Sequence, residues 1–200
     1  MMAKSNKTGT VRIIAGDWRG RRLPVPDLPG LRPSGDRSRE TLFNWLQADL
    51  RGAQCLDLFA GTGVLGLEAV SRGASSAVLV EKNHSAAEQL RENVNMLAAS
   101  QVSVVQSDAL LWLQGQAADS FDLVFIDPPF GQGLTMLALQ ALSSGQQLRA
   151  DGLVYLETAR SEVVPAFSSD WEILREKTLG EVRMQLVRAS RTSKPDRLLE

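Results

Sequence analysis

Apolar residues occur along this chain in short blocks whose spacing predicts alternating strands and helices. Two stretches, 63–73 and 84–99, repeat apolar residues at the three-to-four spacing of an amphipathic helix. Because the strand-like blocks around them are apolar almost throughout, helices should cover both faces of the resulting sheet, as in a parallel sheet. These blocks occupy residues 53–59, 76–81, 102–106, 121–126 and 152–157. The pattern therefore predicts an α/β fold with a mostly parallel central sheet.

The two ends of the chain follow other patterns. Residues 36–50 place apolar side chains at helical spacing, with Asp36 as the expected N-cap. Residues 170–190 contain two strand-like segments that meet near Gly180, which predicts a closing antiparallel hairpin. Residues 12–23 mix apolar and basic side chains and predict a short β-hairpin that turns at 16–20.

Size and composition limit the classes of protein to which the chain can belong. With 200 residues, 44% of them hydrophobic and 22% charged, it fits one globular domain with a short appendage. We expect a basic arm at 1–35, a main domain at 36–190 and a polar tail at 191–200. No apolar run approaches the roughly 18 residues of a membrane helix, and the polar first ten residues are unlike a secretory signal. We therefore expect a cytoplasmic protein.

Cysteine and histidine each occur once, as Cys55 and His84. These numbers exclude an internal disulfide and a metal site built from cysteine or histidine, so we expect no metal. Cys55 lies in an apolar block and is expected to be a buried, inert side chain. His84 is expected near the start of a helix.

The net charge of −1 conceals an uneven distribution. Residues 1–40 hold nine Lys or Arg against four Asp or Glu, whereas the remainder holds thirteen against nineteen. A basic segment can be a solvated tail, but here arginines alternate with apolar side chains, which favours a hairpin that holds them in fixed positions for nucleic acid. The RNA-binding candidates are Arg12, Trp18, Arg19, Arg21 and Arg22.

A glycine-rich loop follows the first of the predicted sheet strands. Gly61, Gly63 and Gly66 satisfy the GxGxxG pattern, in which glycines allow a sharp turn and close approach to a ligand at a helix N-terminus. The alternative is a tight turn that binds no ligand. Asp57, four residues before the loop, would repel a pyrophosphate but attract the cationic amino group and sulfonium of S-adenosylmethionine. Charge therefore favours this methyl donor over a dinucleotide.

Two further carboxylates follow the next two strands. Glu81 can accept hydrogen bonds from both hydroxyls of a ribose, which it would do equally for NAD. Asp108 can accept from an adenine amino group, but a role as N-cap of the following helix is an equal alternative, and the two are compatible.

The fourth strand ends in Asp127, Pro128, Pro129 and Phe130. This tip combines a carboxylate, a backbone stiffened by proline and a ring on which a flat group can stack. It suits a planar amine, because Asp127 and the Pro128 carbonyl can each accept one N–H and leave the nitrogen lone pair directed at a methyl group. A double proline that only ends the strand is the alternative, and it explains the flanking acid and ring less well.

Several of these motifs resemble a known family. "DLFAGTG", "VLVE", "QSDA" and "DPPF", in this order, resemble class I S-adenosylmethionine-dependent methyltransferases that modify exocyclic amines. "RIIAGDWRGRRLPVP", "LRPSGDRSRETLFNWL" and "CLDLFAGTGVLGLEA" resemble the bacterial RsmD family, which methylates the N2 amine of one guanine in 16S ribosomal RNA. The resemblance covers about residues 11–188; Ser34 departs from it, since threonine is more usual there, but the hydroxyl is kept.

The resemblance implies a Rossmann-like fold, partners and site residues. The sheet would have seven strands with helices on both faces, and the partner would be 16S rRNA in the small subunit or an assembly intermediate. The sequence leaves the oligomeric state open, and a monomer is the default expectation. The target guanine would be held by Asp127, Pro128, Pro129 and Phe130. S-adenosylmethionine, converted to S-adenosylhomocysteine, would be bound by Asp57, Phe59, Ala60, Gly61, Gly63, Glu81, Lys82, Asp108, Ala109, Arg32, Pro33 and Arg37.

Two other functions are compatible with the residues. The same tip could accept another planar amine, such as adenine N6 in DNA or a protein glutamine amide. A non-catalytic RNA-binding or NAD-binding domain could also share the fold, because a fold alone does not determine function.

Overall fold

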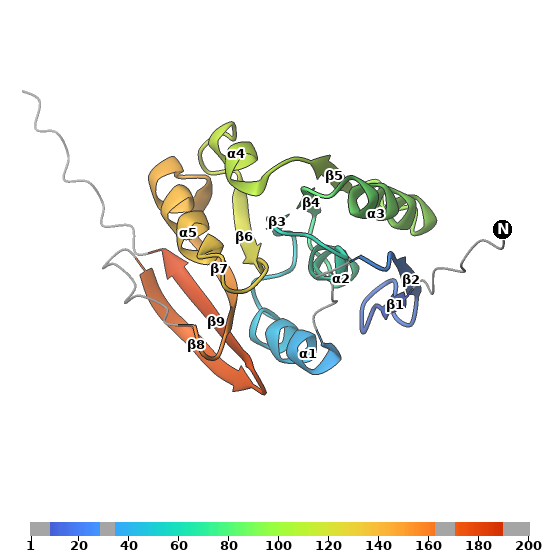
Figure 1. Cartoon of the computed structure of the whole chain (residues 1–200), viewed down its shortest axis with the longest axis horizontal. Coiled ribbons are helices and arrows are strands. Elements are labelled where there is room, and N and C mark those ends of the chain that lie inside the picture. Colours follow the sequence, from blue (N-terminus) through green and yellow to red (C-terminus); the bar gives the residue numbers. More distant parts are fainter. Residues whose placement is uncertain (1–8, 29–34, 163–170, 190–200) are drawn as a thin grey trace, which may run out of the picture.

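The computed structural model describes residues 9–28, 35–162 and 171–189 (Figure 1). Its larger sheet has seven strands in the order β5-β4-β3-β6-β7-β9-β8, of which the first five are parallel. The parallel strands are β5 (Val102–Gln106), β4 (Ser76–Glu81), β3 (Gln54–Asp57), β6 (Phe121–Ile126) and β7 (Leu148–Ala159). The antiparallel pair that completes the sheet is β9 (Val182–Ala189) and β8 (Trp171–Leu179). The predicted fold class and closing hairpin are therefore confirmed.

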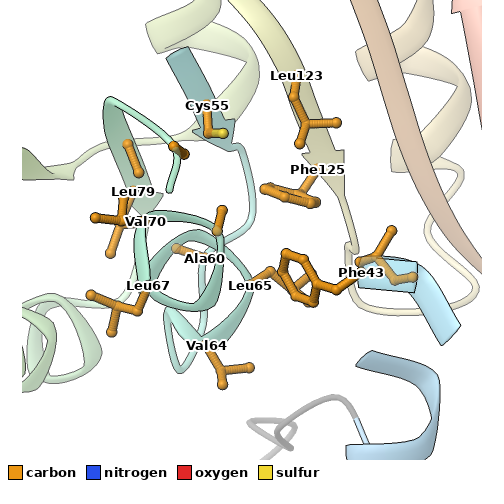
Figure 2. Close-up of a cluster of buried hydrophobic side chains, with 14 of the residues drawn as sticks. Phe43, Cys55, Ala60, Val64, Leu65, Leu67, Val70, Leu79, Leu123 and Phe125 are labelled. Carbon is orange, nitrogen blue, oxygen red and sulfur yellow. The ribbon is translucent and has the colours of Figure 1, made fainter. Parts of the chain in front are cut away.

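Helices cover both faces of this sheet. The side chains of each strand point alternately to the two faces, so Leu123 and Phe125 join one hydrophobic cluster while Val124 and Ile126 join the other. Figure 2 shows part of the first cluster, where Phe43 and side chains of the helix 64–71 gather against the sheet. The first cluster includes side chains of α1 (Asp36–Trp45), α2 (Val64–Ser71) and α3 (His84–Met96). The second includes side chains of α4 (Ala109–Gln114) and α5 (Leu134–Gly145).

The start of α1 differs from the sequence prediction. The N-cap is Gly35, and Asp36 is the first helical residue. The Asp36 carboxylate instead contacts two arginines, Arg39 at 2.5 Å and Arg12 at 3.2 Å, so it is used for ion pairs and not for the helix end. The helix also ends at Trp45 rather than near residue 50, although Leu50 is still buried.

The predicted arm forms a two-stranded hairpin that packs on the main sheet's helices. β1 (Gly9–Arg12) pairs antiparallel with β2 (Arg22–Val25), and the fully buried Ile13 and Leu23 belong to the first core cluster. The turn of the hairpin fits closely against the last residue of α2. Gly16 has φ +81°, and a Cβ there would lie 1.7 Å from the carbonyl oxygen of Ser71. Only glycine fits this contact.

None of the helices in the described part of the chain is long and apolar enough to cross a membrane.

Candidate active site

Four acidic side chains gather at the carboxyl edge of the parallel strands. Asp57 ends β3, Glu81 ends β4, Asp127 follows β6 and Glu157 lies near the end of β7. In an open α/β sheet, ligands bind beyond this edge where the strand order reverses, which here is at β3 and β6. The charges of Asp127 and Glu81 both act on Asp57, and the charge of Asp127 acts on Glu157. We call these four residues the acidic edge.

Asp57 lies beneath the N-terminus of α2. It is 1% exposed, and its Oδ2 accepts a hydrogen bond of 3.1 Å from the backbone N–H of Gly66. Burial raises the pKa of Asp57 to about 7; the Gly66 hydrogen bond opposes this, and the charges of Asp127 and Glu81 add to it. The excess of negative charge at this position favours a cationic ligand and disfavours a phosphate.

The glycine loop has the backbone that the sequence predicted, and two of its glycines also have a role in core packing. Gly61 and Gly63 have φ of 51° and 71°, the left-handed region that glycine adopts without strain. A Cβ at Gly63 would lie 2.4 Å from Cδ2 of Leu90. A Cβ at Gly66 would lie 2.2 Å from Cδ2 of Leu79. The missing side chains of Gly63 and Gly66 therefore make room for the core of the protein.

Glu81 ties the glycine loop to the tip of β4. Its Oε2 accepts from Gly61 N at 2.8 Å, and its Oε1 accepts from Asn83 N at 2.6 Å. Each carboxylate oxygen can accept a second hydrogen bond, so these contacts orient the group and leave capacity for ribose hydroxyls.

Asp108 is the N-cap of α4, as the sequence allowed. Its Oδ1 accepts from the N–H groups of Leu110 and Leu111, and its Oδ2 lies 3.0 Å from Nζ of Lys82. The Lys82 hydrogen bond, together with those of the helix N–H groups, lowers the pKa of Asp108. Lys82 and Asp108 thus form an exposed ion pair between the tips of β4 and β5.

The tip of β6 presents its ring to solvent. Pro128 is buried, whereas Pro129 is exposed and Phe130 is 47% exposed, one of the few large apolar side chains so exposed in the described ranges. An exposed ring beside a carboxylate can act as a platform for a flat polar group.

Sequence reasoning missed two residues of the site, Glu157 and Tyr155. Both are buried, and the Tyr155 hydroxyl donates a hydrogen bond of 2.5 Å to Oε1 of Glu157. The signal that could have found them is the acid at the end of the fifth apolar block, because parallel neighbours place such acids at one edge.

The remaining predicted residues are placed as follows. Phe59 packs against the second core cluster, Ala60 and Ala109 are buried, and Arg37 is exposed in the first turn of α1. Arg32 and Pro33 lie outside the described residues.

The arm holds its arginines away from the acidic edge. The hairpin turn contacts Ser71, the last residue of the eight-residue α2, so it lies about 12 Å along the helix from the end where α2 starts. Trp18 is half-buried there. Arg12 pairs with Asp36, and Arg21 donates to the carbonyl of Met96 at 3.1 Å.

Arg19 and Arg22 are exposed and have no ion pair with any other described residue. They are therefore the arm arginines most available to an external anion.

Within residues 9–28, 35–162 and 171–189, no group of three or more His, Cys, Asp or Glu side chains could hold a metal ion. The donor set of the acidic edge instead fits a ligand with fixed positive charge, hydroxyls and a close backbone contact at Gly61.

The chain resembles characterised and solved proteins over almost its whole length. It matches the family described as Conserved hypothetical protein 95 over residues 11–188. The Ribosomal RNA small subunit methyltransferase D of Escherichia coli strain K12 is 45% identical over 187 residues, which is 92% of this chain and 94% of that protein. The Haemophilus influenzae protein of the same name is 44% identical over 186 residues, which is 90% and 95% of the two chains.

Two solved structures extend the comparison. The protein yhhF from Escherichia coli, assigned provisionally as a methyltransferase, superimposes with a TM-score of 0.84 at 42% identity and covers 90% of this chain and 98% of its own. SMU.776, solved in complex with SAH, superimposes with a TM-score of 0.70 at 14% identity over 94% and 57% of the two chains. At that identity the second likeness shows the fold alone.

Proposed function

Since the chain belongs to the RsmD family of ribosomal RNA methyltransferases, we propose that it transfers a methyl group from S-adenosylmethionine to the N2 amine of one guanine in 16S rRNA. The observation that carries the proposal is that the buried Asp57 and the partly buried Glu81 contact the glycine loop and its helix, at the same edge of the sheet as Asp127 and the exposed Phe130 that follows it in sequence. The carboxylates at the glycine loop suit a cationic donor, and Asp127 with Phe130 suits a planar amine.

The residues of the loop and of three strand tips bind the donor in this proposal. Asp57 provides negative charge for the donor's cationic end, Glu81 accepts from its ribose, and Asp108 accepts from its adenine amino group while it caps α4. Gly61 allows the backbone to approach closely. Phe59, Ala60, Gly63, Lys82 and Ala109 shape the surrounding surface, and Arg32, Pro33 and Arg37 complete the methionine end.

Bound S-adenosylmethionine supplies a methyl group on a positively charged sulfur. Asp127 and the Pro128 carbonyl each accept one N–H of the guanine amine, and Phe130 stacks on the base, while Pro129 stiffens the loop. The nitrogen lone pair forms the bond to the methyl carbon as the carbon–sulfur bond breaks, and the surplus proton leaves to Asp127 or water. Positioning contributes most of the acceleration, because the amine lone pair is otherwise delocalised into the ring.

The arm provides the RNA contacts in this proposal. The guanine must leave its stack to reach Phe130, which costs a few kcal/mol that distant phosphate contacts offset. Arg19 and Arg22 are exposed for this purpose, with Arg12, Arg21 and Trp18 beside them. We further propose that a monomer acts in the cytoplasm on the small subunit or on an assembly intermediate.

The proposal is tested with purified protein, labelled S-adenosylmethionine and four acceptors: small-subunit particles, naked 16S rRNA, DNA and a glutamine-containing protein. We expect transfer to the particles, and mass-spectrometric mapping should place one added methyl on guanine N2. A strain that lacks the protein should lose that methylguanine from its rRNA. Transfer to DNA or protein without transfer to rRNA would refute the proposed substrate.

A further inference from the structure

Glu157 and Tyr155 are buried polar residues to which the chemistry above gives no task. The pairing of β6 with β7 places Phe125 beside Tyr155 and Ile126 beside Leu156. Continuing this register by one residue places Asp127 beside Glu157, and paired residues on neighbouring strands point to the same face of a sheet. Tyr155, two residues earlier on β7, points to that face as well. The backbone therefore brings a tyrosine and a glutamate to the residue that holds the amine.

The rings next to Tyr155 and the β9 residue paired with Glu157 are apolar. Tyr155 is 0% exposed and Glu157 is 5% exposed. The ring of Phe125 lies 6.3 Å from that of Tyr155, and Phe43 of α1 lies 6.2 Å from Phe125. On β9, the residue paired with Glu157 is Met184, which carries no charge.

The polar contacts of Glu157 lie on two sides. One oxygen accepts from the Tyr155 hydroxyl at 2.5 Å, and a side-chain hydrogen bond joins Glu157 to Asp127. A hydrogen bond between two carboxyl groups requires a proton, so the pair cannot be doubly ionised while that bond exists.

We propose that Glu157 is a positioning residue that keeps the shared proton and donates it to Asp127, which fixes the orientation of the Asp127 carboxylate toward the target amine. Tyr155 orients Glu157 through the hydrogen bond from its hydroxyl. This inference rests on the proposed role of Asp127 in methyl transfer.

The electrostatics agree with this arrangement. Burial raises the pKa of Glu157 to about 8, and the charge of Asp127 and its hydrogen bond with Glu157 add to the rise, whereas the Tyr155 hydrogen bond opposes it. Glu157 is therefore protonated at neutral pH. Above its pKa, the second negative charge repels Asp127 and the bond between them is lost, so transfer should decline on the alkaline side.

The first test observes Glu157 directly and needs no RNA. The protein is labelled with ¹³C at the glutamate carboxyl carbons, and the Glu157 signal is assigned by its absence in Glu157→Gln. We expect the protonated chemical shift at pH 7 and titration above it. Tyr155→Phe should move that titration to higher pH, because the hydroxyl stabilises the ionised form. A Glu157 that titrates near the ordinary glutamate value of about 4.3 would overturn the proposal, whatever the substrate proves to be.

The second test measures transfer to small-subunit particles. Glu157→Ala should lower kcat on the order of 100-fold through misplacement of Asp127, with unchanged donor affinity by calorimetry. Glu157→Gln keeps an N–H donor toward Asp127, so its kcat should be much closer to wild type and should lack the alkaline decline. The matched control is Thr158→Val, at the adjacent buried position of β7, where the hydroxyl has no hydrogen-bond partner among the residues that the structure describes. Wild-type kcat in Glu157→Ala, or an unchanged alkaline decline in Glu157→Gln, would refute the role.

Discussion

Two regions of this protein bury a carboxylate, and the charges around it differ in sign between them. Glu68 of α2, with a fully buried side chain, contacts Arg39 at 2.7 Å and Arg72 at 2.8 Å and accepts from the backbone N–H groups of Ile14 and Ala15. At the acidic edge, Asp57 receives a backbone N–H, while neighbouring acids raise its pKa.

The difference indicates that the Glu68 region stabilises the fold, whereas the acidic edge is suited to ligand binding. Around Glu68, cations and N–H groups offset the cost of burial and join the arm, α1 and α2 into one unit. At the acidic edge, like charges are held together at a cost in stability, which is a common property of sites that bind a ligand of opposite charge. Two variants test this contrast, and a third tests the exposed arginines of the arm.

The largest effect is expected from Arg39→Ala. Removing this fully buried cation leaves part of the negative charge of Glu68 uncompensated. Such a loss typically costs 3–5 kcal/mol, so we expect the free energy of unfolding to fall by about 3–5 kcal/mol. Urea denaturation measures it, with Arg91→Ala on the exposed surface of α3 as the control, expected within about 0.5 kcal/mol of wild type. A loss below about 1 kcal/mol would mean that the network around Glu68 contributes little to stability.

Asp57→Asn is expected to have a smaller effect of opposite sign, a rise in the free energy of unfolding of the ligand-free protein at neutral pH. Because the pKa of Asp57 rises from 3.8 to about 7 on folding, the native state binds more protons in that interval, and stability falls as pH increases through it. The slope is at most about 1.4 kcal/mol per pH unit for one group.

Asparagine at position 57 should therefore make the unfolding free energy less dependent on pH between 4 and 7, and it should weaken S-adenosylmethionine binding by calorimetry. Glu157 remains as a second source of pH dependence in the variant. If the unfolding free energies of the variant and wild type depended identically on pH, the ionisation of Asp57 would not be a source of this pH dependence.

The smallest change in stability is expected from the double variant Arg19→Ala, Arg22→Ala. These side chains are exposed, so the free energy of unfolding should change by less than about 0.5 kcal/mol per substitution. The affinity for small-subunit RNA should fall, and the slope of log affinity against log salt should decrease by about 0.7 to 0.9 for each lost phosphate contact. Filter binding at several salt concentrations measures this. A slope equal to that of wild type would show that RNA binds another surface and that the arm is only a structural element.

Local patterns were sufficient to predict much of this molecule. Apolar blocks and glycines identified the five parallel strands, the loop at Gly61 and both hairpins, because each depends on neighbours in sequence. The tip at Asp127 was recognisable because its four unusual residues are consecutive.

The features that were missed depend on the register of distant segments. Glu157 becomes part of the site only when β7 pairs with β6, and Arg39 is buried only when α1 meets Glu68 on α2. Asp36 was expected to cap its helix, but its carboxylate instead pairs with Arg39 in the same helix and with Arg12 of the distant arm. The packing role of Gly63 was also missed, because the side chain that leaves no room for a Cβ there belongs to Leu90 of α3.

The position of β9 has a consequence for synthesis of the chain. The last described strand to leave the ribosome lies inside the sheet, between β7 and β8, and not at its edge. Until it is made, β7 presents an open row of unpaired backbone groups, a template for association with other nascent chains. The segment that carries Glu157 is therefore closed on its second side only after β9 has been synthesised, and a messenger truncated before residue 182 should yield an aggregating product rather than a partly active one.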